Sequence, residues 1–232
     1  MPFTPADPWT LVAFVAILIG VVAAFQFGLK TVAARTQNLT DARRAVRRSA
    51  WGLALWLGML SLIVSSGFLS AAPFPRALIF LGASNLAAVL LAFSPVGSQL
   101  AQGLSIGTLV AFQTFRLPLE LVLHSWALGG TIPMSMTWDG QNFDIVSGIV
   151  ALMAAPFVNN RRTLAWLVNI LGFGLLLNVV RVAVMSSPFP FAWPVEPSLQ
   201  LAFHLPYALI VPICVAGSLA GHLILTRRLF SR

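Results

Sequence analysis

The sequence predicts an all-α, polytopic integral membrane bundle of about seven transmembrane helices. Of its 232 residues, 58% are hydrophobic and only 9% are charged, and its mean hydropathy is +0.89. This composition leaves too little polar surface to cover a water-soluble globule of this length. The apolar runs are about as long as the roughly 20 residues that a helix needs to cross a bilayer. We therefore expect a single transmembrane domain, residues 1–232, with the lipid bilayer around it.

The expected spans are separated by short segments that contain Pro, Gly or charged residues. In chain order they are Pro8 to Leu29, Ala50 to Ala72, Arg76 to Phe93, Gln99 to Leu128, Phe143 to Val158, Thr163 to Met185 and Leu199 to Thr226. Pro118 lies within the fourth span, where it removes a backbone donor and clashes with the preceding turn. We expect a kink or break there.

The distribution of basic residues predicts the orientation. Most of the 14 lysine and arginine residues lie in the first loop, in the loop with Arg161 and Arg162, and in the C-terminal tail. Seven spans place these three segments on one side, which the positive-inside rule assigns to the cytoplasm. We expect a multi-pass protein of the cell (cytoplasmic or inner) membrane, with its N-terminus outside and its C-terminus inside.

The net charge of +8 does not indicate a nucleic-acid partner. The basic residues flank membrane spans and are not interleaved with aromatic residues, so membrane topology accounts for them. We expect no nucleic acid among the partners.

Two arginines, Arg116 and Arg181, lie inside expected spans, where a charge costs about 2.5 to 3.5 kcal/mol on insertion scales and normally marks a polar interior. Most of the other unexplained polar residues fall at the same level, the outer half of the membrane. They are Glu120 and His124 on the face of Arg116, Asp139, Asn142 and Asp144 in or after the next loop, Asn178 beside Arg181, and His204 and Tyr207 in the last span. We expect a polar cavity there, bounded by spans four, six and seven and capped by the loop Thr131 to Phe143.

Structural roles compete with a functional one for several of these residues. Arg116 and Glu120 have the i, i+4 spacing of an ion pair within one helix. Asp144 is placed to cap the fifth span, and Tyr207 fits an aromatic belt. Arg181 differs, because no acidic residue lies within a helical turn of it. Its counter-ion must come from another span, a loop or a bound anionic group.

Three short motifs from Asp144 to His222 resemble the core of the exosortase and archaeosortase family. They are S-G-I at Ser147 to Ile149, N-x-x-R at Asn178 to Arg181, and His204 early in the last span. The resemblance implies a membrane transpeptidase whose proposed outer-face site combines Cys, Arg and His. Arg181 and His204 match, but Val146 occupies the position of the Cys, so the thiol nucleophile is not carried over.

The leading hypothesis is an exosortase-like protein that lacks this thiol and binds an anionic peptide or lipid group through Arg116 and Arg181. In it His204 carries a proton or donates a hydrogen bond, and Asp144 orients it or acts as a base. The pattern indicates no cofactor and no metal site. Two alternatives remain open. One is a small transporter or proton-coupled channel with Glu120, His124 and His204 as the relay, which requires polar continuity to the cytoplasmic side. The other is a structural subunit in which Arg181 pairs with a partner membrane protein.

Overall fold

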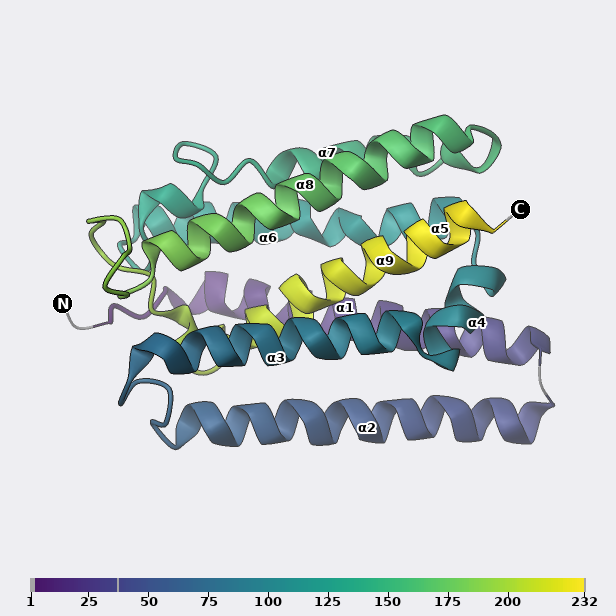
Figure 1. The fold of residues 1–232 in the computed structure, drawn as a ribbon, viewed down its shortest axis with the longest axis horizontal. Helices are drawn as coiled ribbons and strands as arrows, with labels where there is room; N and C mark the ends of the chain where they lie inside the picture. Colours follow the sequence, from purple (N-terminus) through teal and green to yellow (C-terminus); the bar gives the residue numbers. More distant parts are fainter. Residues whose placement is uncertain (1–2, 37, 232) are drawn as a thin grey trace.

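The computed structural model describes residues 3–36 and 38–231, and these form a bundle of helices with no strand among them (Figure 1). The α-helices are α1 Pro8–Thr36, α2 Leu39–Ser65, α3 Pro73–Phe93, α4 Pro95–Gly103, α5 Ile106–Ala111, α6 Arg116–Leu128, α7 Ile145–Ala154, α8 Arg162–Ser186 and α9 Ala216–Phe230. The predicted all-α fold is confirmed.

Six helical stretches of the described chain are long and apolar enough to cross a membrane. They are Pro8–Arg35, Thr40–Ser65, Pro73–Phe93, Ile106–Leu128, Arg162–Ser186 and Tyr207–Phe230. Large apolar side chains remain exposed along them, such as Leu62 at 72% and Leu167 at 62%, as expected for surfaces that lipid covers. The chain is thus a multi-spanning membrane protein.

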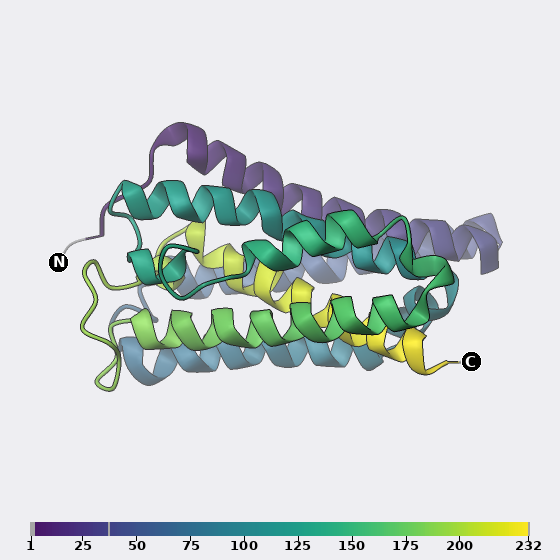
Figure 2. The ribbon, with the colours of Figure 1, turned by 90° about the horizontal axis from the view of Figure 1, so that it is seen from above.

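The predicted span from Phe143 to Val158 differs from the other six. Its regular helix, α7, covers only Ile145–Ala154, which is shorter than a membrane-crossing helix. It still runs antiparallel to α6 and α8 (Figures 1 and 2).

The two chain ends therefore lie at opposite ends of the bundle (Figure 1). We call them the N-terminal end and the C-terminal end. The α6–α7 loop lies at the N-terminal end, whereas the last turn of α1, the first turn of α2 and the α7–α8 connection lie at the C-terminal end (Figure 1). The three basic segments thus gather at one end of the molecule, as the sequence predicts.

Several predicted boundaries need correction. Helix α2 begins at Leu39, because Asn38 caps it by accepting a hydrogen bond from the Asp41 amide at 2.9 Å. The four arginines Arg43, Arg44, Arg47 and Arg48 are consequently helical. The predicted fourth span is divided, since α4 ends before Ser105 and Ser105 caps α5.

The prolines interrupt regular α-helix as expected. A 3₁₀ turn, Phe112–Phe115, separates α5 from α6 just before Pro118. The last span begins with a 3₁₀ turn, Tyr207–Leu209, and a π-helical segment, Ile210–Val215, that contains Pro212.

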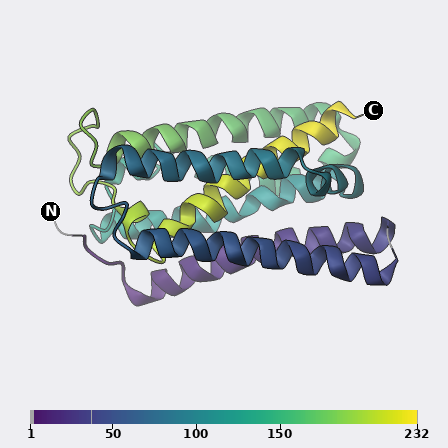
Figure 3. The same cartoon turned by 60° about the horizontal axis from the view of Figure 1, so that its bottom comes forward.

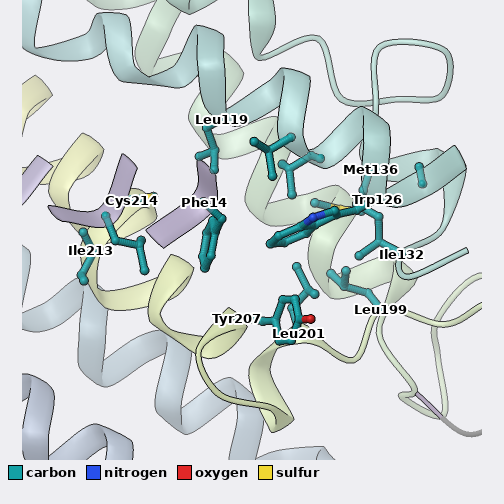
Figure 4. Close-up of a cluster of buried hydrophobic side chains, with 14 of the residues drawn as sticks. Phe14, Leu119, Trp126, Ile132, Met136, Leu199, Leu201, Tyr207, Ile213 and Cys214 are labelled. Atoms are coloured by element: carbon teal, nitrogen blue, oxygen red, sulfur yellow. The ribbon is translucent and has the colours of Figure 1, made fainter. Parts of the chain in front are cut away.

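A large apolar core fills the half of the bundle toward the N-terminal end (Figure 4). The Trp126 ring packs edge-on against Phe14 and Tyr207, with ring centroids 5.0 and 5.1 Å apart. The Tyr207 hydroxyl accepts a hydrogen bond from the Ala6 amide at 3.0 Å. Tyr207, which the sequence placed among the ligand-binding residues, is thus a buried core residue.

Candidate functional site

Arg116 is the centre of the buried polar structure. It begins α6 and is only 1% exposed. Its Nε donates to Asp144 Oδ2 at 2.6 Å and its Nη2 donates to Asp144 Oδ1, which makes a two-point ion pair. Its Nη1 donates to the Gly172 carbonyl at 3.0 Å and lies 3.1 Å from His222 Nε2. Every guanidinium nitrogen therefore has a protein partner.

This pairing identifies the ion-pair partner of Arg116. Arg116 pairs with Asp144, 28 residues away, and not with Glu120 on its own helix. Each of its guanidinium nitrogens has a partner within the bundle, so an anionic ligand at Arg116 would compete with Asp144.

Asp144 reaches Arg116 because α7 packs very closely against the start of α6. A Cβ on Gly148 would lie 2.4 Å from the Leu117 backbone nitrogen, so only glycine permits this approach. Asp144 occupies the N-cap position, but its side chain makes no capping bond. It instead accepts from the Ser147 hydroxyl at 3.0 Å. Ser147 and Gly148 of the S-G-I motif thus support the Arg116–Asp144 ion pair, Ser147 by its hydrogen bond and Gly148 by permitting the close packing.

From this centre, hydrogen bonds extend toward the N-terminal end. The Asn142 amide nitrogen donates to both Glu120 carboxylate oxygens, each at 3.0 Å, and to the Met136 carbonyl at 3.0 Å. The Asn142 side-chain oxygen accepts from the Asp144 backbone amide at 3.1 Å. Asn142 of the loop therefore covers Glu120, which is only 1% exposed.

A second arm extends toward the C-terminal end. His222 Nδ1 lies 2.9 Å from Asn169 Oδ1, and Asn169 Nδ2 donates to the Thr226 hydroxyl at 2.7 Å. Gly172 makes room, because a Cβ there would lie 2.7 Å from His222 Cε1. The sequence-based site omitted this arm, although the i, i+4 spacing of His222 and Thr226 places both on one helix face. We call the series Glu120, Asn142, Asp144, Arg116, His222, Asn169 and Thr226 the polar chain.

Arg181 lies apart from the polar chain, on the exposed surface of α8 at the N-terminal end. Its Nε and Nη2 donate to Asn178 Oδ1 at 3.3 and 2.9 Å, and its Nη2 also donates to Gln141 Oε1 at 3.2 Å. Asn178 Nδ2 donates to the Gln141 carbonyl at 2.7 Å, and the guanidinium carbon lies 5.4 Å from the Trp193 ring centroid. We call Arg181, Asn178, Gln141 and Trp193 the Arg181 site.

The partners of Arg181 are all neutral. None of the ion pairs among the described residues includes it. The spacing of the N-x-x-R motif has a direct explanation, because residues three apart on a helix lie on one face. Gln141 was not a predicted site residue, and its contribution comes from the fold of the loop.

The two histidines expected in the site have aromatic partners. His204 is half-buried and stacks on Phe3, with ring centroids 4.0 Å apart, and its burial lowers the pKa of the imidazole. His124 stacks on Trp138 at 4.1 Å. His124 Nδ1 lies 3.7 Å from Asp139 Oδ2, which is too long for a hydrogen bond.

The three catalytic candidates are therefore not assembled into one hydrogen-bonded group in the described structure. Asp144 bonds Arg116 and Ser147, Arg181 bonds Asn178 and Gln141, and His204 stacks on Phe3. A cavity of about 100 Å³ is lined by Asp144 together with Arg116, Glu120 and mainly apolar side chains of α3 and α8. Arg181 and His204 do not line it.

Among residues 3–36 and 38–231, no group of three or more His, Cys, Asp or Glu side chains is placed to hold a metal ion. No family model matches the chain, and neither a curated protein nor a solved structure is significantly similar to it.

Proposed function

We propose that this membrane protein binds an anionic group, such as a peptide carboxylate or a lipid headgroup, at the Arg181 site. One observation supports this most strongly: the exposed guanidinium of Arg181 is held by neutral acceptors and has no acidic partner in the described chain. Its charge is therefore oriented but not neutralised. A guanidinium fork matches a carboxylate or phosphate, so this arrangement suits such a ligand.

The surrounding residues favour binding with a fixed orientation. Asn178 and Gln141 restrain the planar guanidinium, and Trp193 packs beside it. Restraint before binding reduces the entropy lost when the ligand arrives. The basic segments at the opposite end of the bundle support an outward-facing location for this site.

We propose that the protein is exosortase-like in its binding of an anionic group and not in its chemistry. Asn178 and Arg181 act together, as that resemblance implies, but Val146 provides no nucleophile and its side chain is 39% exposed on α7. The Asp144 carboxylate forms an ion pair with Arg116. We therefore propose recognition of the anionic group without acyl transfer.

A titration of the protein in nanodiscs with a short apolar peptide tests this proposal. A peptide with a free C-terminal carboxylate is expected to bind more tightly than its amidated form. Arg181→Gln is expected to weaken binding about tenfold to a hundredfold, because a hydrogen bond to a charged group is worth about 1.5–3 kcal/mol. Arg76→Gln is the matched control, since Arg76 is a partly exposed arginine of α3 that donates to the Phe68 carbonyl at 2.7 Å. Equal affinities for all three proteins would contradict the proposal.

The polar chain favours a second candidate function, a proton-coupled transporter. This alternative requires polar continuity toward the cytoplasmic side, and the polar chain runs from Glu120 on α6 toward the C-terminal end, to Thr226 on α9. Hydrogen-bonded series of Asp, Glu and His are typical of proton relays.

Proton flux into proteoliposomes, measured with an internal pH-sensitive dye under a diffusion potential, tests this alternative. Flux is expected in the wild type and in Arg181→Gln, and it is expected to be lost in His222→Phe, which interrupts the polar chain. Flux no greater than in protein-free vesicles would remove this candidate.

A further inference from the structure

A second, larger cavity lies between the α1–α2 pair and the helices α3, α5 and α9. Its volume is about 620 Å³, within the range of about 300–1,000 Å³ that is typical of ligand sites. Helix α2 packs on α1 and α3 packs on α9, and the α1–α2 pair lies on one side of the bundle (Figure 3). Most of its lining is apolar, including Trp56 of α2, Ala87 of α3 and Ala216 of α9.

The polar residues of this cavity gather mainly at its C-terminal end. Arg35, in the last turn of α1, lines it together with Ser105 and Thr108. Arg35 makes one long hydrogen bond, 3.4 Å from its Nη1 to the Gly103 carbonyl, and belongs to none of the ion pairs among the described residues. It therefore carries a charge that the protein does not neutralise.

The neighbouring surface is also positive. Helix α2 has four arginines at positions 43, 44, 47 and 48. The acidic residue at this end, Asp41, forms an ion pair with Arg44 at 3.2 Å. An occupant whose polar group lies at Arg35 is thus expected to be anionic.

The body of the cavity excludes water as the occupant. A buried water needs two to four polar partners, and an apolar lining does not supply them. Within a bilayer, the molecules at hand with a long apolar part are lipids. We propose that this cavity holds one acyl chain of an anionic phospholipid, with its phosphate group at Arg35.

The selectivity of such a site must come from the headgroup. An acyl chain gains little hydrophobic free energy on moving from the bilayer into the cavity, because both surroundings are apolar. One arginine near an anionic headgroup accounts for a preference of about fivefold over a zwitterionic lipid. The second acyl chain stays in the surrounding bilayer.

Fluorescence quenching tests this proposal directly, because Trp56 lines the cavity. The protein is reconstituted in phosphatidylcholine vesicles that contain increasing fractions of phosphatidylglycerol with brominated acyl chains. The contribution of Trp56 is obtained by subtracting the signal of Trp56→Phe. We expect quenching that saturates at a low fraction of brominated phosphatidylglycerol, whereas brominated phosphatidylcholine quenches only in proportion to its amount.

Three variants identify the site. Ala87→Trp fills the cavity and is expected to abolish the saturable quenching, while Ala83→Trp, at an exposed position of the same helix, keeps it. Arg35→Gln is expected to weaken it about fivefold. Proportional quenching by both lipids in the wild type would overturn the proposal without reference to any variant. Saturable quenching that Ala87→Trp leaves unchanged would overturn it as well.

Discussion

The buried ion pair of Arg116 and Asp144 predicts that substitutions of the two residues are coupled in their effects on the free energy of unfolding. Removing one member leaves the other as an unpaired charge in the interior, which costs about 3–5 kcal/mol. We therefore expect Arg116→Met and Asp144→Leu each to lower the free energy of unfolding by about that amount. The double variant removes both charges together, so its loss of unfolding free energy is expected to be smaller than the sum of the losses of the two single variants.

The loss of unfolding free energy in the double variant follows from the hydrogen bonds that other residues make to Arg116 and Asp144. In the double variant Ser147, the Gly172 carbonyl and His222 each lose a hydrogen bond to the pair. A buried group left without its partner costs about 1–3 kcal/mol. The double variant is thus still expected to be less stable than the wild type.

Unfolding in bilayers or mixed micelles, followed by steric trapping or by titration with a denaturing detergent, measures these free energies. Arg181→Gln is the control, because substitution of an exposed side chain usually changes stability by no more than about 0.5 kcal/mol. If the losses of the two single variants simply added in the double variant, Arg116 and Asp144 would not be energetically coupled, and the description of the site's centre would be refuted.

Two further predictions concern stability. Gly148→Ala places a Cβ 2.4 Å from the Leu117 backbone nitrogen and is expected to cost about 1–3 kcal/mol of unfolding free energy. The control is Gly174→Ala, whose Cβ meets nothing within 4 Å and which is expected to gain up to about 1 kcal/mol. Equal effects of the two substitutions would contradict the close packing at Gly148. Hydrogen bonds from Thr10 lower the pKa of Asp7, so the stability that this carboxylate supplies is present above its unfolded pKa and is lost as pH falls. The difference in Tm between wild type and Asp7→Ala is therefore expected to narrow from about pH 7 to about pH 3, whereas a constant difference would show that the ionised carboxylate is not responsible.

Hydrophobicity alone predicts most of the helices, because an apolar run in a bilayer has few other structures available. The predicted span Arg76 to Phe93 differs from α3 by three residues at one end, and the span Thr163 to Met185 differs from α8 by one residue at each end. Other bounds differ more: α2 begins at Leu39 and not at Ala50, the fourth predicted span is divided at Ser105, and α7 covers only part of the predicted span Phe143 to Val158. Helix α7 begins directly after Asp144, which pairs with Arg116, and ends at Ala154.

Pairing across the bundle was harder to predict than pairing along one helix. The contact of Arg181 with Asn178 follows from a spacing of three residues. The choice of Asp144 over Glu120 as the partner of Arg116 depends on the close packing at Gly148, which the local spacing does not reveal. The aromatic partners of His204 and Tyr207 likewise depend on where residues near the N-terminus pack.

A double-mutant cycle across the binding site tests the central claim, that Arg181 binds an anionic group. It combines four titrations: the peptide as free acid and as amide, each with the wild type and with Arg181→Gln in nanodiscs. A direct contact predicts a coupling free energy of at least about 1.5 kcal/mol between the peptide carboxylate and the guanidinium. A coupling free energy near zero would show that Arg181 does not touch the carboxylate, and would contradict the account.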